Sequence, residues 1–240
     1  MPRFGVNLNN REPLIAPAYD LAALLDLSTE VEHLGFDSVW VGDSLFSKPR
    51  YEPLALLAAI SQRTSRVRLG TACLVTSTRN PLYLALEWAT LDVLSGGRTI
   101  LGACKGNPEE GVRREFAALG LDHTKAGSIW EEGLHVLRTL WTEGEITFHG
   151  DHFDYDGSFY QYTDVSLVPR PLQHPHPPLV MAAQSADSVR WAGQRGIPIT
   201  QMYLPARKHG TAWLPIASPR KAPMASDWAH RAFAISEPCT

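Results

Sequence analysis

Hydrophobic and polar positions along this chain follow the periods of strands and helices, most clearly between residues 67 and 106. The apolar run of residues 67–75 predicts a strand. Asn80 and Pro81 then predict the start of a helix, because Asn caps a helix well and Pro loses no hydrogen bond at the first helical position. Apolar side chains recur at helical spacing inside that helix, at Leu84, Trp88, Leu91 and Leu94. The pattern therefore predicts a strand followed by a helix with one apolar face.

A second strand completes this unit. Ser95-Gly96-Gly97 predict the end of the helix, because glycine adopts the left-handed conformation of a C-cap freely. Residues 99–103 predict a short apolar strand. A strand–helix–strand crossover of this length implies parallel pairing and an α/β fold. Cys104 and Lys105 follow that strand directly, at the position where α/β folds place their chemistry.

The same periods predict the remaining elements. Strands are expected at residues 4–8, 38–41, 179–182 and 197–200, and helices at 21–34, 51–63, 110–118, 129–141 and 185–191. About six βα units result, and such units build either a barrel or an open doubly wound sheet. No Gly-x-Gly-x-x-Gly motif follows the first strand, which weakens the dinucleotide-binding alternative.

Two segments depart from the βα pattern. Residues 145–168 alternate aromatic and polar side chains around Asp156-Gly157, which predicts a β-hairpin insertion. After residue 204, prolines at positions 205, 215, 219, 223 and 238 disfavour helix and no apolar face persists. We therefore expect a folded domain at residues 1–204 and an irregular or disordered tail at residues 205–240.

Composition and charge exclude several classes of protein. The net charge of −3 gives no reason to expect a nucleic-acid or anionic-membrane partner. Cys73, Cys104 and Cys239 are scattered, without a Cys-x-x-Cys pair, which disfavours a disulfide framework or a metal site. The first ten residues lack the apolar core of a signal peptide, and no run reaches the roughly 18–20 apolar residues of a membrane span. These features predict a cytoplasmic protein.

Five short motifs occur in order along the chain, at residues 35–40 (GFDSVW), 68–72 (RLGTA), 79–81 (RNP), 90–98 (TLDVLSGGR, followed by Leu101-Gly102) and 182–185 (AAQS). With these motifs the chain resembles the bacterial luciferase-like family of flavin-dependent oxidoreductases over residues 3–204. The resemblance implies a TIM-type (β/α)8 barrel, here incomplete at its C-terminal end, with a flavin at the carboxyl ends of the strands. It also implies a substrate pocket capped by insertions such as the hairpin.

The segment Gln184-Ser185-Ala186, with Ser188, follows a predicted strand and opens a helix. Free N–H groups and the positive dipole end of a helix form an anion site, to which the serine hydroxyls add donors. The resemblance implies that this element holds the flavin phosphate. The alternative is that Ser185 serves only as an N-cap. Asp187 is unfavourable beside a phosphate.

Two lysines match basic positions of the family. Lys105 lies where relatives carry a basic residue that contacts the phosphate, and Lys125 is a second candidate for this role. Lysine keeps the charge of arginine but lacks its bidentate fork. The alternative for each lysine is a solvated surface charge.

Three further residues match positions near the flavin ring. Cys104 matches a reactive thiol near the ring in luciferase α chains, although most single cysteines are small core residues. Ala72-Cys73 aligns with a pair that carries a non-prolyl cis peptide under the isoalloxazine ring in relatives. The alternative for this pair is an ordinary trans strand.

The chain departs from its oxygenase relatives after the second strand. Those relatives often carry a histidine general base there, whereas this chain carries Asp43 and Ser44. Either side chain is a candidate for orienting a substrate, but neither has the near-neutral pKa of imidazole.

The resemblance implies a monooxygenase-like oxidoreductase in which reduced FMN from a separate flavin reductase acts with oxygen on a small organic substrate. One alternative is hydride transfer that depends on coenzyme F420. Another is a non-catalytic flavin-binding or truncated, inactive protein, because relatives continue with further βα units where this chain becomes Pro-rich. Without those units the first and sixth strands would be open edges, which favours a homodimer.

Overall fold

A computed structural model of the chain describes residues 3–16, 20–144, 146–155, 167–183, 185–200 and 235–236. Six parallel strands in these residues lie side by side in chain order: β1 (Phe4–Leu8), β2 (Ser38–Val41), β3 (Arg68–Thr71), β5 (Thr99–Cys104), β8 (Leu179–Ala182) and β9 (Ile199–Thr200). The strand order never reverses, as it would in a doubly wound sheet. The sheet is therefore the wall of a barrel, which confirms the predicted fold class and chooses between the two architectures left open by the sequence.

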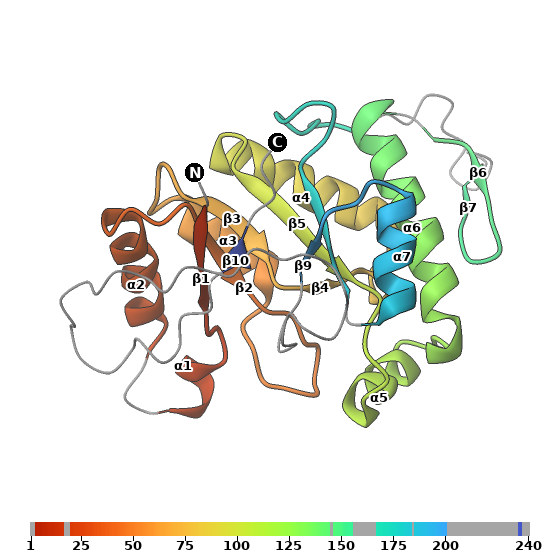
Figure 1. The fold of residues 1–240 in the computed structure, drawn as a ribbon, viewed down its shortest axis with the longest axis horizontal. Coiled ribbons are helices and arrows are strands. Elements are labelled where there is room, and N and C mark those ends of the chain that lie inside the picture. Colours follow the sequence, from red (N-terminus) through yellow and green to blue (C-terminus); the bar gives the residue numbers. More distant parts are fainter. Residues whose placement is uncertain are drawn as a thin grey trace.

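Helices connect the successive strands and cover the outer face of the sheet (Figure 1). They are α2 (Leu21–His33), α3 (Pro53–Ser61), α4 (Pro81–Ser95), α6 (Ala126–Thr142) and α7 (Ala186–Gln194). Shorter elements follow the strands: α1 (Glu12–Ile15), β4 (Leu74–Val75), η1 (Thr76–Thr78), α5 (Glu110–Ala118) and η2 (His123–Lys125). No helix in the described part of the chain has the length and apolar character needed to cross a lipid bilayer.

The predicted ends of α4 are confirmed. The Asn80 side chain accepts hydrogen bonds from the backbone N–H groups of Leu82 and Tyr83, and Pro81 is the first helical residue. Gly96 ends the helix with a φ of 69°, in the left-handed region that glycine adopts without strain. Local capping chemistry thus fixes the length of the helix that precedes β5.

Other boundaries differ from the sequence-based expectation. The strand expected at residues 67–75 is divided into β3 and β4 at a cis peptide between Ala72 and Cys73. The hairpin is present as β6 (Phe148–His149) and β7 (Asp154–Tyr155), but its turn lies at residues 150–153. Asp156-Gly157, the expected turn, lies outside the described residues.

The edge of β1 is partly paired. β10 (Ile235–Ser236) lies antiparallel to β1, with Phe4 opposite Ser236 and Gly5 opposite Ile235. The expectation of an open edge is therefore wrong at these two positions, because a second strand takes up β1 groups that would otherwise be unpaired. The remainder of the expected tail, residues 201–234 and 237–240, lies outside the described residues.

A tryptophan fills the interior of the curled sheet. Trp40 on β2 is 1% exposed and packs with three other buried side chains, Ala72, Ile100 and Val180. A Cβ atom at Gly70 would lie 2.5 Å from ring atom Cζ3 of Trp40, and one at Gly5 would lie 2.6 Å from Nε1. The neighbouring strands β1 and β3 therefore carry glycine where the indole needs space.

Candidate functional site

The predicted site residues come from neighbouring strands of one parallel sheet. Asp43 and Ser44 follow β2, Ala72 and Cys73 follow β3, Cys104 and Lys105 end or follow β5, and Ser185 and Ser188 open the helix after β8. Because the strands are parallel, their carboxyl ends meet at the same edge of the sheet. The structure thus brings these residues to one edge, which we call the carboxyl edge. Gln184 lies outside the described residues.

Asp43 is fixed in place by two partners. Its carboxylate accepts a hydrogen bond from the backbone N–H of Val75 at 3.0 Å and pairs with Arg79 at 3.1 Å. The Asp43 side chain is 8% exposed, and Arg79 also pairs with Glu52 at 3.3 Å. Asp43 therefore holds the start of η1 against the loop after β2. Its expected contact with a substrate stays a prediction.

Burial raises the pKa of Glu87, on the neighbouring helix α4. The charge of Arg79 opposes this change, whereas that of Glu52 adds to it. The guanidinium of Arg79 thus serves more than one carboxylate beside the carboxyl edge.

Ser44 belongs to a hydrogen-bond network around a buried carboxylate. Oε1 of Glu115, a residue of α5 that is 2% exposed, accepts hydrogen bonds from the Ser44 hydroxyl at 3.1 Å and from the N–H groups of Phe46 and Ser47, both at 2.7 Å. Burial alone would raise the pKa of Glu115, but these backbone and hydroxyl donors outweigh it and lower the pKa. The carboxylate therefore ties the loop of residues 44–48 to α5.

Sequence reasoning missed Glu115, and it also missed Asn10. Asn10 is fully buried after β1, where its amide donates to the carbonyl oxygens of Gly42 at 2.8 Å and Tyr51 at 2.9 Å. Its side-chain oxygen accepts a hydrogen bond from Arg50 at 2.8 Å. The signal in the sequence that could have identified Asn10 is that this polar residue lies just two positions after the first predicted strand. Asn10 joins the loops that follow β1 and β2.

Cys73 and Cys104 belong to neighbouring segments, since Cys73 precedes β4 and Cys104 ends β5. β4 and β5 pair in parallel, with Leu74 opposite Ala103 and Val75 opposite Cys104. Both cysteines are half-buried, and neither forms a disulfide. The nearby Cys104 thiol, burial and the negative charge of Asp43 raise the pKa of the Cys73 thiol. The predicted cis peptide before Cys73 is confirmed.

The start of α7 has the geometry of an anion site. Ser185 is the N-cap, because its hydroxyl oxygen accepts a hydrogen bond from the N–H of Ser188 at 3.1 Å. The two hydroxyl groups lie 2.9 Å apart, so the cap role and a ligand role use the same side chains. Asp187 pairs with Arg190 at 2.7 Å, which offsets its negative charge. The N–H groups of the first turn, including that of Ala186, are not used within the helix.

The two candidate lysines are exposed and come from different elements. Lys105 follows β5, and its carbonyl oxygen accepts a hydrogen bond from the Ser77 hydroxyl at 2.7 Å. Lys125 lies on η2, which packs beside α5 through His123 and Phe116, whose ring centroids are 4.9 Å apart. Lys105 therefore lies on a strand end of the carboxyl edge, whereas Lys125 lies on a flanking turn.

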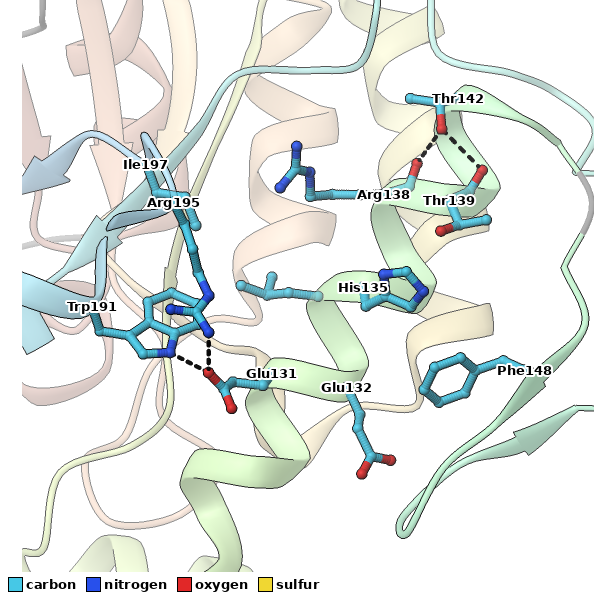
Figure 2. A pocket seen from close by; sticks show the side chains of 11 residues that line it. Glu131, Glu132, His135, Arg138, Thr139, Thr142, Phe148, Trp191, Arg195 and Ile197 are labelled. Carbon is cyan, nitrogen blue, oxygen red and sulfur yellow. Dashed lines mark hydrogen bonds and ion pairs between the residues drawn. The ribbon is translucent and has the colours of Figure 1, made fainter. Parts of the chain in front are cut away.

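A cavity of about 650 Å³ lies elsewhere, between α6, α7 and β6 (Figure 2). Glu131 on α6 accepts a hydrogen bond from the indole of Trp191 and pairs with Arg195 at 3.2 Å. The guanidinium of Arg195 stacks 4.0 Å from the Trp191 ring, and the Trp130 and Trp191 rings lie 4.7 Å apart. The predicted site residues do not line this cavity, so it joins outer helices and is separate from the carboxyl edge.

The described strands and their carboxyl edge agree with the comparison to known families. The family model described as luciferase-like monooxygenase matches residues 2–216. This chain belongs to the luciferase-like monooxygenase family. The motifs that predicted this membership occupy β2, β3, β5, the end of β8 and both ends of α4, so the resemblance and the fold rest on the same segments.

Relatives within the luciferase-like family differ in their cofactors. The chain is 28% identical over 185 residues to the oxygenase component of a flavin-dependent trigonelline monooxygenase from Acinetobacter baylyi, covering 75% of this chain and 49% of that protein. It is 32% identical over 183 residues to an F420-dependent glucose-6-phosphate dehydrogenase from Amycolatopsis mediterranei, covering 72% and 51%. The chain therefore spans about half the length of these curated relatives.

A solved structure supports the same membership. The monooxygenase RslO1 from Streptomyces bottropensis superposes with a TM-score of 0.67 and 28% sequence identity, over 82% of this chain and 58% of that one. Of the two curated relatives, one is named as flavin-dependent and the other as F420-dependent.

Proposed function

We propose that this chain is a flavin-dependent, monooxygenase-like oxidoreductase, in which reduced FMN and oxygen act on a small organic substrate. The observation that carries this proposal is the composition of the carboxyl edge. The N-terminus of α7 with its two serines and the exposed Lys105 suit a phosphate, while the cis peptide and the two thiols flank the neighbouring strand ends. The relative named as an oxygenase component supports a separate flavin reductase as partner.

A buried hydroxyl group that lacks a hydrogen-bond partner also supports the binding of a cofactor at this edge. The hydroxyl of Thr76 is buried and makes no hydrogen bond with any residue that the structure describes. Thr76 follows β4 directly, at the carboxyl edge. Buried polar groups are rarely left without a partner, so a ligand at this edge would find a hydrogen-bonding group ready.

Each part of the edge has a separate role in this proposal. The first turn of α7, Ser185 and Ser188 bind the phosphate, and Lys105 adds positive charge. Ala72, Cys73 and Cys104 contact the ring, while Asp43 and Ser44 orient the substrate. When bound, the flavin supplies the redox chemistry with oxygen.

The loop after β2 excludes water in this proposal. The Glu115 carboxylate holds the loop in place, and Leu45 and Phe46 at its tip are exposed apolar side chains. An apolar tip that covers the bound cofactor would keep solvent from the reacting atoms.

The second candidate is an F420-dependent hydride-transfer enzyme. It is favoured by the 32% identity with the F420-dependent glucose-6-phosphate dehydrogenase. In that case Lys105 and Lys125 would both meet the more anionic tail of F420. Both lysines are exposed, so their charges are accessible to such a tail.

The test is a fluorescence titration of the purified chain with FMN and with F420, each oxidised and reduced. Ser185→Ala and Lys105→Ala are expected to weaken FMN binding about tenfold each, since each removes a hydrogen bond to a charged group. Arg63→Ala, which removes an exposed charge paired with Asp26 away from the edge, serves as the control and should change affinity less than about twofold.

Each result decides between named functions. FMN binding that weakens in both edge variants supports the flavin proposal. Tight F420 binding with weak FMN binding moves the function to hydride transfer. If the chain binds neither cofactor, both candidate functions are contradicted. That result favours a chain that does not hold a flavin by itself.

A further inference from the structure

The cavity between α6, α7 and β6 has the size and the lining of a small-molecule site. Its volume of about 650 Å³ falls within the range of roughly 300–1,000 Å³ that is typical of ligand pockets. Its apolar walls are formed by Leu134, Phe148, Trp191 and Ile197. None of the described residues that we assign to the cofactor or the substrate lines this cavity, so it is independent of the proposed flavin site.

The wall formed by the hairpin is fixed to α6. The carboxylate of Glu132 accepts hydrogen bonds from three consecutive backbone N–H groups of the hairpin turn, those of Asp151, His152 and Phe153, at 3.1, 2.9 and 3.3 Å. The imidazole of His152 also forms a hydrogen bond of 2.8 Å with the hydroxyl of Ser128. The strand β6, which precedes this turn, is therefore held beside the cavity.

The wall formed by α7 is fixed by the second carboxylate of the cavity. Glu131 accepts a hydrogen bond from the indole of Trp191 and pairs with Arg195 at 3.2 Å. The guanidinium of Arg195 in turn lies 4.0 Å from the centre of the Trp191 ring. Glu131 and Glu132 are thus both engaged by donors of the protein, and neither can bind a cationic ligand without losing those partners.

Arg138 is the charged group of the lining that remains for a ligand. Its side chain extends from α6 towards the side of the cavity formed by Arg195 and Ile197 (Figure 2). Its guanidinium makes no hydrogen bond or ion pair with the residues that the structure describes, and the same holds for the Thr139 hydroxyl and the His135 imidazole in the lining. A guanidinium beside a hydroxyl group suits a carboxylate, which accepts two parallel hydrogen bonds from it.

We propose that this cavity binds a small aromatic carboxylate. The carboxylate pairs with Arg138, and the ring lies among the apolar side chains that include Phe148 and Trp191. Flat groups already pack in pairs on both walls, since Phe148 lies 5.3 Å from the His135 ring and Trp191 lies 4.7 Å from the Trp130 ring. A rigid aromatic ring adds to such walls at a lower cost in conformational freedom than a flexible chain.

The probe is 2-naphthoate, titrated by isothermal calorimetry into the full chain without flavin. Its carboxylate is ionised at neutral pH, whereas 2-naphthamide has the same ring system without the charge. We expect one equivalent of 2-naphthoate to bind with a Kd of about 10–100 μM. The amide should bind at least about tenfold more weakly, because it cannot form charge-assisted hydrogen bonds with the guanidinium.

Variants of α6 locate the bound acid. Arg138→Ala should weaken the binding of 2-naphthoate at least about tenfold, and Arg138→Lys should weaken it less, because lysine keeps the charge but loses the bidentate fork. Thr139→Phe should abolish binding, since it fills the cavity without a change of charge.

The matched control is Arg113→Ala. Arg113 is an exposed arginine on α5 that does not line the cavity, and its guanidinium also has no partner among the described residues. Its removal should change the Kd for 2-naphthoate less than about twofold. Arg113→Ala therefore corrects for the loss of one positive charge from the surface.

Binding of the acid at the carboxyl edge would give a different pattern. Lys105→Ala, which we expect to weaken FMN binding, should leave the affinity for 2-naphthoate unchanged, and FMN should not displace the acid. Unchanged binding of 2-naphthoate in Arg138→Ala overturns the inference, whether or not Lys105→Ala loses it. Equal affinities for the acid and the amide, or a Kd above about 1 mM for the acid, also overturn it. FMN titration of the same variants reports on the proposed function alone.

Discussion

The two ends of the parallel sheet differ in how their polar groups are satisfied. At the amino end, all five N–H groups of the Arg98 guanidinium donate hydrogen bonds, to oxygens of Ser61, Thr64, Ser95 and Val67. At the carboxyl edge, Lys105 and Ser185 are exposed, and the Thr76 hydroxyl has no partner among the described residues. A saturated network stabilises a fold, whereas unsatisfied groups are available to a ligand.

A second hydrogen-bond network at the amino end of the sheet is centred on Glu32. The Glu32 carboxylate accepts hydrogen bonds from the backbone N–H groups of Ser65 at 3.0 Å, Arg66 at 2.7 Å and Val67 at 2.8 Å. It thereby fixes the start of β3 to the end of α2. The comparison predicts that substitutions at the amino end lower stability, while those of the exposed groups at the carboxyl edge change binding.

The largest effect on stability is expected for Arg98→Ala. The substitution leaves several buried carbonyl groups without their donor, and we expect a loss of about 3–5 kcal/mol in the free energy of unfolding. Urea denaturation followed by circular dichroism measures it. Arg114→Ala, which removes an exposed arginine paired with Glu110 on α5, is the control and should cost less than about 0.5 kcal/mol. Equal effects of the two substitutions would remove the contrast between the two ends.

Glu115→Ala tests a strongly buried anchor near the carboxyl edge. It should cost about 2–3 kcal/mol, because the N–H groups of Phe46 and Ser47 lose their acceptor. Hydrogen exchange at these two amides should become faster. The matched control is Glu110→Ala, an exposed position on the same helix. Unchanged exchange at residues 46 and 47 would show that the loop holds its conformation without Glu115.

Glu32 should make the amino end sensitive to acid. Burial alone would raise its pKa, but the backbone N–H groups of Val67, Arg66 and Ser65 lower it from 4.5 to about 2. A depressed carboxyl pKa contributes stability above the unfolded value, and this contribution is lost as the pH falls from about 4.5 towards 2. Allowing for solvent screening, we expect about 1–2 kcal/mol.

The pH dependence is measured by comparing denaturation of the wild type and Glu32→Gln between pH 2 and 7. The difference in stability between them should be largest near neutral pH and shrink towards pH 2. A difference that stays constant over this range would argue that the carboxylate charge contributes nothing.

Lys105→Ala should have the smallest effect on stability, below about 0.5 kcal/mol, because the side chain is exposed. Its carbonyl still accepts the Ser77 hydroxyl, since the backbone is unchanged. Urea denaturation, as for Arg98→Ala, measures this effect, so the losses in the free energy of unfolding of the two variants can be compared directly. A large loss of stability in Lys105→Ala would mean that the carboxyl edge is also built for stability.

Local patterns predicted much of the fold. Asn80 and Gly96 act within a few residues of their own helix, so the ends of α4 could be read from the sequence. The order of the strands could not, because it depends on pairing between distant segments. The turn of the hairpin was also misplaced, since alternating aromatic and polar residues predict strands without fixing where they reverse.

The same distinction applies to the site. The carboxyl edge was predictable because parallel strands must end together, which places Ser185 and Cys104 at the same edge of the sheet. Glu115 was not, because its bond to Ser44 spans 71 positions of the sequence. Likewise, only the pairing of β4 with β5 shows that Val75 lies opposite Cys104. Roles that depend on long-range hydrogen bonds need the three-dimensional structure.

The neighbouring, tilted indoles of Trp130 and Trp191 give the molecule an optical signature. Their rings lie 4.7 Å apart and are inclined by 54°, so their electronic transitions should couple and produce a paired signal in circular dichroism. One ring belongs to α6 and the other to α7, the helix whose first turn we assign to the cofactor phosphate. Movement of α7 away from its neighbour would erase that signal, so the docking of this helix can be followed in real time without a label.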